Sequence, residues 1–567
     1  SSSCFNTVMI TYLVGSEKSH LQTFTSLYQQ ALGEIVQSGL ARDLLVAELN
    51  KYEFGVREDA SKAQRGLDLL SKSLAAFKYG TDPFEALQTE EVLKSIREKA
   101  LEQGYFEKLI EAHLVDNPAT VAVVLEPDPE KIVRTAQQEQ ERIDHYEQTL
   151  GDGDLESLVE RTQELISRQQ QPNDDETLAK LPQLTVADLP DKAEFHTASP
   201  EQLFGQLALI SELPTNRISY LDIGFDLSCL PSEYLPLLDV FGTIITEIGT
   251  SKLDFMQFAK EAATCTGGLN HSINTYTAHG TPESVRPVLW INAKMLPEYL
   301  ERGIDLLTDL FSDLSLADRG RIGEIVRREF AWAEHSAQSE GYGLASTRVF
   351  SHLSPAGRYQ ELYSGVTAYR SLKELALEYQ GQEDSFLNSL QQMAGTLLNR
   401  DNMVISFTAE DQEIERFKSF GQRFVEALPQ NGAPEPHIVS PLESVRNEAF
   451  ITAAEVVFAV QGGNLFKAGS GYKGSFEVLK TYLSRDYLWN SVRQIGGAYG
   501  CFIQFSSITG NLAMVSYRDP QVSKTYEAYD RLPQVVSDME LSPQALEQLI
   551  IGTYGNFDPH QLSLIHI

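Results

Sequence analysis

Apolar residues recur along the first part of the chain with two different periods. Residues 19–38 and 40–59 place them at helical spacing, which predicts two helices. Residues 6–14 (NTVMITYLV) and 120–125 (TVAVVL) are short apolar runs, which we interpret as strands. Residues 1–127 are therefore interpreted as part of an α+β domain.

The pattern changes after residue 128. From about Glu130 to Gln171 the chain is rich in Gln and Glu, and its sparse apolar residues keep helical spacing around a Gly-Asp-Gly-Asp break at 151–154. This pattern predicts the two helices of an antiparallel hairpin. We interpret residues 128–190 as a linker that joins two halves of the protein and does no chemistry itself.

Two further α+β units are predicted beyond the linker. The elements expected in the first are a strand at 218–228, helices at 231–249 and 254–264, a strand at 270–278 and long helices within 295–400. The second is expected to begin with a strand at 403–409 and to continue with a helix to Leu428 and a strand at 455–463. Strand, long helix and returning strand recur, although no repeat is detectable residue by residue.

Composition and charge restrict the possible functions. The 567 residues are 42% apolar, which suits folded cores, and a chain of this length divides into three or four compact units. The formal charge of −33 opposes binding to a phosphate backbone, so we expect no nucleic-acid partner. An acidic surface can attract basic peptides, but an ordinary solvated surface is the simpler explanation.

Cysteine usage favours a reducing compartment. The four cysteines show no C-x-x-C spacing, so we expect neither a disulfide framework nor a thiolate metal site; they are Cys4, Cys229, Cys265 and Cys501. No apolar run approaches the roughly 20 residues that span a bilayer, so no membrane association is expected.

Both ends of the sequence are unusual. The first four residues, Ser-Ser-Ser-Cys, include no initiator Met and begin no signal-peptide pattern, so we expect the natural start to lie upstream. Residues 562–567 (LSLIHI) resemble a translated sequencing adapter, and we exclude this adapter-derived tail from the fold prediction.

Helical zinc motifs of the H-E-x-x-H or H-x-x-E-H type are absent from the sequence. Such motifs need two histidines four residues apart on one helix face. No two of the eleven histidines have this spacing. His335, beside Glu334, is interpreted as a surface helix residue, so we expect no metal ligands in this chain.

The segment GSGYKG (469–474) matches the G-x-G-x-x-G fingerprint of dinucleotide-binding folds. It lies between a predicted strand and a predicted helix. However, the loop before its first glycine is too long for the tight turn, and Asp486 falls inside a helical pattern instead of ending a second strand. We therefore expect no nucleotide cofactor.

Candidate chemistry concentrates in DYLWNSVRQIGGAYGCFIQF (486–505). A predicted helix with Trp489 and Arg493 is followed by a glycine pair, Tyr499 and a predicted strand. A guanidinium offers several planar donors and a phenol offers one, which suits a peptide carbonyl or a developing oxyanion. On the residues alone, a structural corner with a salt-bridged Arg493 and a core Tyr499 is the simpler explanation.

Several stretches together carry a family resemblance. The most specific is YLSRDYLWNSVRQIGGAYG, followed by SYRDP (516–520) and LEQLIIGT (546–553). Further matches are KYEFGVRE (51–58), DPFEALQ (82–88), YFEKLIEAHLVDNP (105–118), YLDIGFDLSCLP, TGGLN (266–270) and LYSGVTAYR (362–370). In these stretches, and over essentially all of residues 1–560, the chain resembles the presequence protease, or falcilysin-like, branch of the insulysin and pitrilysin clan.

The resemblance implies an α+β fold of repeated domains, each an antiparallel-rich sheet packed with helices, in two halves joined by a long helical hairpin. Peptides are enclosed in the chamber between the halves. Residues 1–127 would be part of the second domain, 128–190 the hairpin, 191–435 the third domain and 436–561 a truncated fourth domain. The first domain, which carries H-x-x-E-H and a later Glu that bind zinc, would be missing.

The resemblance also suggests how a zinc motif is lost in the third domain. If VFGTIITEIGT (240–250) corresponds to the motif helix of the first domain, the ligand and base positions fall on Val240, Thr243 and Ile244. None of these side chains binds zinc or takes a proton.

The family's Arg and Tyr that reach toward the scissile bond correspond to Arg493 and Tyr499. The resemblance implies that Arg493 holds a substrate carbonyl and that Tyr499 donates to the substrate or to the tetrahedral oxyanion. Gly496 and Gly497 would let the backbone approach the peptide closely.

The resemblance therefore predicts the substrate-enclosing C-terminal portion of a zinc metalloendopeptidase, inactive alone because the zinc belongs to the missing domain. A non-catalytic structural or assembly subunit of the same clan is the alternative. We expect a monomer whose partners are unfolded peptides and the N-terminal zinc domain of the same polypeptide. A cytoplasmic location is expected, with the mitochondrial matrix or a plastid as alternatives.

Overall fold

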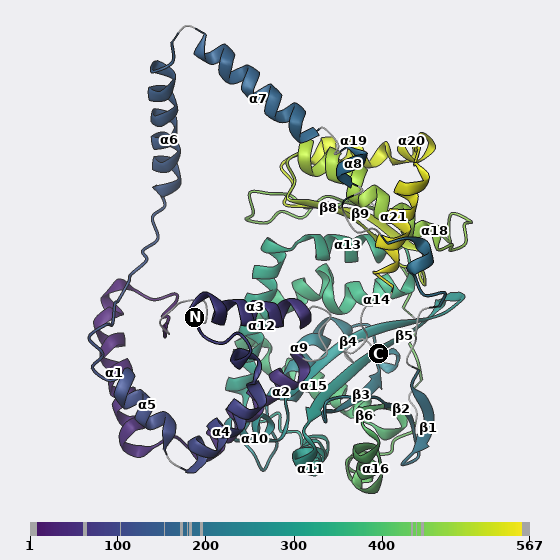
Figure 1. The fold of residues 1–567 in the computed structure, drawn as a ribbon. Helices are drawn as coiled ribbons and strands as arrows, with labels where there is room; N and C mark the ends of the chain where they lie inside the picture. Colours follow the sequence, from purple (N-terminus) through teal and green to yellow (C-terminus); the bar gives the residue numbers. More distant parts are fainter. Residues whose placement is uncertain are drawn as a thin grey trace. The chain divides into compact units, whose positions relative to one another are not determined.

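The chain forms two units in a computed structural model. The structure describes residues 8–59, 65–102, 104–151, 153–170, 174–178, 180, 184–192, 197–432, 435–437, 439–443 and 447–557. Contacts group Ser1–Leu40 with Glu102–Leu189, and Ala41–Leu101 with Pro190–Ile567 (Figure 1). The domain boundaries expected from the sequence stay predictions, and the predicted adapter tail lies outside the described residues. No helix in the described ranges is both long and apolar enough to cross a bilayer.

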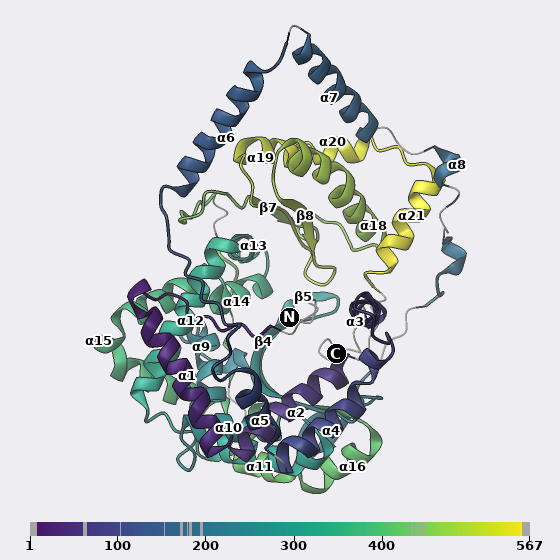
Figure 2. The same cartoon turned by 60° about the vertical axis from the view of Figure 1, so that its left-hand side comes forward.

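The first unit consists of helices in the part that the structure describes. α1 (Leu21–Ser38) packs against α5 (Tyr105–His113), and the Leu40 N–H donates to the Glu107 carboxylate at 2.8 Å. The two predicted linker helices are confirmed as α6 (Lys131–Gln148) and α7 (Asp154–Gln170). They meet at the Gly-Asp-Gly-Asp break and diverge from it (Figure 2).

The two strands predicted for this unit are not found in its described residues. Residues 8–14 and 120–125 form no strand, and the side chains of Met9, Val121 and Leu125 are exposed. A strand needs a neighbour to complete its hydrogen-bond ladder, and the described part of this unit supplies none. The prediction was wrong because a local apolar run does not specify such a neighbour.

A six-stranded sheet organises the second unit, in the order β1-β2-β6-β3-β5-β4. The strands are β1 (Ser199–Leu203), β2 (Gln206–Glu212), β3 (Ser219–Asp226), β4 (Gly268–Ala278), β5 (Thr281–Met295) and β6 (Met403–Ala409). Every neighbouring pair is antiparallel except β2 and β6, so the predicted α+β, antiparallel-rich fold is confirmed. β6, predicted to begin the next unit, lies between β2 and β3 and completes this one.

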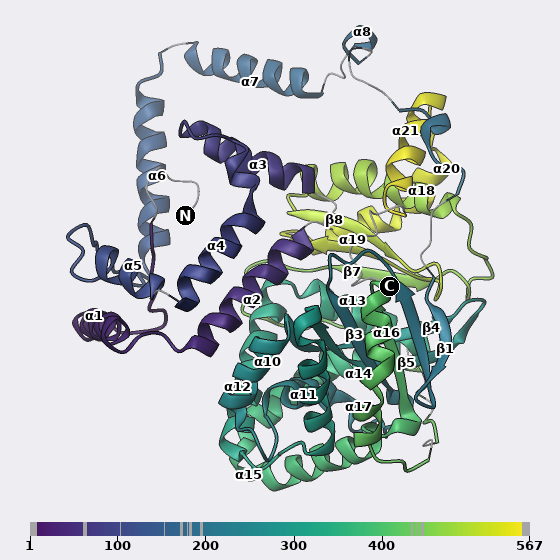
Figure 3. The same cartoon turned by 60° about the horizontal axis from the view of Figure 1, so that its bottom comes forward.

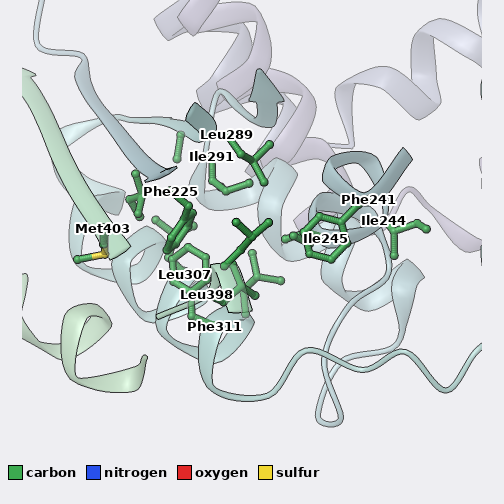
Figure 4. Packing of buried hydrophobic residues seen from close by; sticks show 14 of the residues in the cluster. Phe225, Phe241, Ile244, Ile245, Leu289, Ile291, Leu307, Phe311, Leu398 and Met403 are labelled. Carbon is green, nitrogen blue, oxygen red and sulfur yellow. The ribbon is translucent and has the colours of Figure 1, made fainter. Parts of the chain in front are cut away.

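Helices cover one face of this sheet. They are α9 (Leu238–Glu247), α10 (Phe255–Cys265), α11 (Leu300–Ser312), α12 (Arg319–Ser339), α14 (Pro355–Ser364), α15 (Val366–Leu397), α16 (Asp411–Phe420) and α17 (Gln422–Ala427). Figure 4 shows Phe225 and Ile291 of the sheet in the same core as Phe241 of α9 and Phe311 of α11. The alternation of apolar and polar positions in β3 and β5 therefore determines which face is buried.

α2 (Arg42–Asp59) packs on the same domain, next to α10 (Figure 3). Phe54 is buried at 2% exposure, and its ring lies so close to Gly267 that a Cβ there would come within 2.5 Å. The Asn50 amide donates to the Thr264 carbonyl at 2.8 Å. Two stretches that carry the family resemblance, KYEFGVRE and TGGLN, therefore contact each other.

A second, three-stranded sheet follows in the order β7-β9-β8, with all pairs antiparallel. Its elements are β7 (Val460–Asn464), α18 (Ser475–Tyr482), β8 (Gly500–Phe505), β9 (Asn511–Tyr517), α19 (Val522–Asp530), α20 (Leu532–Ser537) and α21 (Pro543–Tyr554). β7 and β9 pack against α13 (Tyr342–Phe350). The predicted strand at 455–463 is found mainly as β7, with Val457 in an isolated bridge to Asp519.

Candidate functional site

The helix that carries Arg493 is wider than an α-helix. After α18, the chain continues through the π-helical segments η8 (Leu483–Tyr487) and η9 (Trp489–Ile495). Such turns are rare and occur frequently at functional sites. η9 buries Val492 in the core of this small domain and leaves Trp489 largely exposed. Trp489 and Arg493, four residues apart, therefore share the outer face of the segment.

A glycine corner joins η9 to the sheet. Gly497 has a φ of +84°, in the left-handed region that favours glycine. Its N–H donates to the Arg493 carbonyl at 2.9 Å, and the Tyr499 N–H donates to the Tyr517 carbonyl of β9 at 3.0 Å. Gly497 thus ends the helix within a few residues of Arg493 and directs the chain into β8. The corner places Arg493 and Tyr499 on one side of the domain.

Arg493 is held by an aromatic ring. Its guanidinium carbon lies 3.8 Å from the centroid of the Trp489 ring and 5.9 Å from that of Tyr499. No carboxylate among the described residues forms an ion pair with it. Stacking restrains the guanidinium plane but leaves its in-plane N–H groups free to donate to another molecule.

Tyr499 is 67% exposed, and its hydroxyl has no hydrogen bond to any described residue. Its ring contacts that of Tyr517 at 5.7 Å between centroids, and Tyr517 in turn contacts Tyr342 of α13 at 5.7 Å. The phenol is therefore positioned from below while its O–H points to no internal acceptor. The simpler explanation offered by the sequence, a salt-bridged Arg493 and a core Tyr499, is wrong.

These side chains line an open pocket with a volume of about 550 Å³. Its lining consists of Trp489, Arg493, Gln494, Gly497, Ala498, Tyr499 and Arg518. Arg518 was not predicted from the sequence. It reaches the site because β8 and β9 pair with Gly500 opposite Tyr517, a register that the local pattern around 486–505 does not contain.

The two glycines of the predicted site differ in their surroundings. Gly497 lines the pocket. Gly496 is buried beneath it, and a Cβ there would come within 2.4 Å of the Val492 carbonyl oxygen. Gly496 therefore has a packing role in the corner, and close approach of a peptide to either glycine stays a prediction.

The described residues do not fit a zinc ion. None of them form a group of three or more His, Cys, Asp or Glu side chains that could hold a metal. Val240, Thr243 and Ile244, which we aligned with a zinc motif, are buried along α9. Burial also raises the pKa of Cys229, Cys265 and Cys501 to about 12, which keeps these thiols protonated at neutral pH.

The glycine-rich segment 469–474 does not have the surroundings of a dinucleotide site. β7, the strand before it, ends at Asn464 and pairs antiparallel with β9. A dinucleotide fingerprint requires a tight turn between a parallel strand and a helix. The structure therefore agrees with the interpretation of GSGYKG as a loop.

Comparison with known proteins identifies the family of the chain. A family model for the associated domain of M16 peptidases, subfamily C, matches residues 125–375, and one described as PreP C-terminal domain matches residues 447–566. The chain is 28% identical over 559 residues to Presequence protease 1, chloroplastic/mitochondrial, of Arabidopsis thaliana, covering 97% of this chain and 51% of that protein. The chain belongs to the presequence protease-like M16 peptidases.

Other M16 relatives match over a similar extent. Protein HypA of Clostridium perfringens is 28% identical over 544 residues, covering 96% of this chain and 55% of that protein. The chain spans about half the length of the curated relatives it matches. A solved structure of a conserved protein from Enterococcus faecalis V583 has 13% identity and a TM-score of 0.47, covering 64% of this chain and 85% of that chain. The pocket residues all fall within the match to the PreP C-terminal domain.

Proposed function

We propose that this M16 chain is the substrate-enclosing C-terminal portion of a zinc metalloendopeptidase that degrades unfolded peptides in a closed chamber. The observation that carries the proposal is that Arg493 and Tyr499 lie on one pocket with their donors unpaired. The Arg493 guanidinium would donate to a substrate carbonyl. The Tyr499 O–H would donate to the oxyanion as the attacked carbonyl becomes tetrahedral.

Activation of the attacking water would come from outside this chain. Zinc, which supplies an activated water and polarises the carbonyl, does not fit the described residues. We propose that an N-terminal domain of the same polypeptide binds it and that this chain alone is inactive. The proposal includes a monomeric cytoplasmic protein, with a mitochondrial or plastid location as the alternative.

The first experiment is to obtain the complete gene and to search its N-terminal domain for H-x-x-E-H with a downstream Glu. Their presence supports the peptidase. A first domain without the motif would instead support a non-catalytic structural or assembly subunit of the same clan.

The second experiment tests Tyr499 in the full-length protein. Tyr499→Phe removes one oxyanion donor, so we expect kcat for peptide hydrolysis to fall about 100-fold to 1,000-fold with an unchanged thermal unfolding curve. Tyr472→Phe, at another partly exposed tyrosine of the same domain, is the matched control and should leave kcat unchanged. Equal kcat values for wild type and Tyr499→Phe would overturn the role assigned to Tyr499.

A further inference from the structure

Arg518 lies where two pockets meet. It lines the pocket of Arg493 and Tyr499, and it also lines a neighbouring pocket of about 280 Å³ beside His335 of α12 and the segment 454–456. Its side chain is exposed, and its guanidinium carbon is 5.6 Å from the centroid of the Tyr517 ring. The two pockets therefore share one cationic residue.

No carboxylate among the described residues neutralises this guanidinium. The acid next to it in the chain, Asp519, is fully buried. The Asp519 carboxylate accepts hydrogen bonds from the Thr525 hydroxyl at 2.6 Å and from the Gln521 N–H at 2.8 Å. Asp519 is therefore committed to the interior of the domain.

The backbone at Arg518 is held in an unusual conformation. Its φ of +48° is in the left-handed region, which side chains other than glycine rarely adopt. The Tyr499 N–H donates to its carbonyl at 3.3 Å, and the next residue forms a backbone bridge with Val457, with hydrogen bonds of 2.8 and 3.0 Å. The bridge and the Tyr499 contact together fix the position of Arg518 relative to the corner that carries Tyr499.

The local charge is opposite in sign to that of the whole chain. The formal charge of the chain is −33, yet the first pocket is lined by two arginines and no acid, and the second adds His335 and again no acid. Two unneutralised guanidiniums on one pocket repel each other unless an anion joins them. A guanidinium binds a carboxylate through two parallel hydrogen bonds.

We infer that Arg518 binds a carboxylate of the peptide substrate while Arg493 holds a peptide carbonyl. This inference rests on the proposed function, because it assigns a second contact to the same peptide. The carboxylate belongs either to the C-terminus of the peptide or to an Asp or Glu side chain. Both sources present the same planar pair of oxygens to the guanidinium.

The test measures binding of three fluorescein-labelled peptides to the chain by anisotropy. The peptides share one sequence. The first has a free C-terminal carboxylate and no acidic residue, the second has an amidated C-terminus and one Glu, and the third has an amidated C-terminus with Gln in place of that Glu. Each is titrated with wild type, Arg518→Gln, Arg518→Lys and Arg531→Gln. Arg531, exposed on the same domain and outside both pockets, is the matched control for loss of one positive charge.

We expect wild type and Arg531→Gln to bind at least one carboxylate peptide about five-fold more tightly than the third peptide, the gain of one exposed, bidentate ion pair. Arg518→Gln should abolish this ratio without weakening the third peptide, and Arg518→Lys should keep part of it. A gain for the first peptide identifies the C-terminal carboxylate, and a gain for the second identifies a side chain.

Two results would overturn the inference, and they are distinguishable from each other. If wild type binds all three peptides equally, or if the gain survives Arg518→Gln, the carboxylate contact is absent while peptide binding stands. If none of the peptides binds wild type, the proposed peptide-clamping function fails as well.

Discussion

Two arginines near the three-stranded sheet have opposite surroundings. Arg348 of α13 donates to Glu361 at 3.1 Å and to Glu448 at 2.7 and 2.9 Å. Arg493 of η9 is stacked on Trp489 and pairs with no carboxylate among the described residues. The same functional group is therefore neutralised where α13 meets the chain near Glu448 and left free at the pocket.

The difference teaches what each arginine contributes. Glu361 is fully buried, and its carboxylate also accepts hydrogen bonds from the Thr367 N–H and hydroxyl at 3.1 and 2.9 Å, at the start of α15. A buried carboxylate at a helix N-terminus is stabilised by these donors and by the paired guanidinium. Arg348 therefore contributes to the fold, whereas Arg493 contributes donors for a ligand.

The largest expected effect comes from exchanging each arginine for methionine. Arg348→Met leaves the buried Glu361 without its cation, so we expect the free energy of unfolding to fall by about 3 kcal/mol in urea denaturation. Arg493→Met removes no ion pair, so its free energy of unfolding should stay within about 0.5 kcal/mol of wild type. Peptide hydrolysis by the full-length protein should show the reverse order. Equal destabilisation by the two changes would show that Arg493 has a structural partner after all.

A smaller effect is expected from the ring beneath Arg493. Trp489→Leu removes a stacked ring worth about 0.5–1 kcal/mol, so peptide affinity should fall about two-fold to five-fold in an anisotropy titration. The matched control is Trp332→Leu, because Trp332 is also exposed and carries Arg328 at 5.1 Å from its ring, outside both pockets. The role of Trp489 is contradicted if both changes weaken binding alike.

The smallest effect is a dependence of stability on acid. The Arg348 guanidinium lowers the pKa of Glu448 from its ordinary value of 4.5. The folded state therefore binds the proton less tightly than the unfolded state, so this contribution is present above the ordinary pKa and is lost as pH falls through the lowered value. Below pH 4.5, Glu448→Gln should flatten the curve of unfolding free energy against pH. An unchanged slope would show that Glu448 stays ionised in both states.

The sequence predicts elements best where one face is buried. β3 and the helix at 254–264 were predicted because their apolar periods are regular, and both lie in the main core. β5 was missed because its alternation is clear only in its second half, where the burial alternates toward Met295. β6 was found but assigned to the wrong unit, since pairing between β2 and β3 depends on contacts almost 200 positions apart.

The candidate site was predictable only as far as it is local. Arg493 and Tyr499 are separated by one glycine corner, so their spacing along the chain already brings them together. Arg518 and Tyr517 join them through the register of β8 with β9, and Tyr342 joins them through packing of α13 on the sheet. Neither register nor packing between distant elements is contained in a local pattern of residues.

The docking of α2 also has a consequence for synthesis on the ribosome. Asn50 and its partner Thr264 are 214 positions apart, so at roughly 5–20 residues per second α2 waits about 10–40 s for its binding surface to be translated. During that interval the aromatic side chain of Phe54 has no glycine-lined surface to cover it. Nascent chains at this stage expose an amphipathic helix, and this is the interval in which holding by a chaperone has most to prevent.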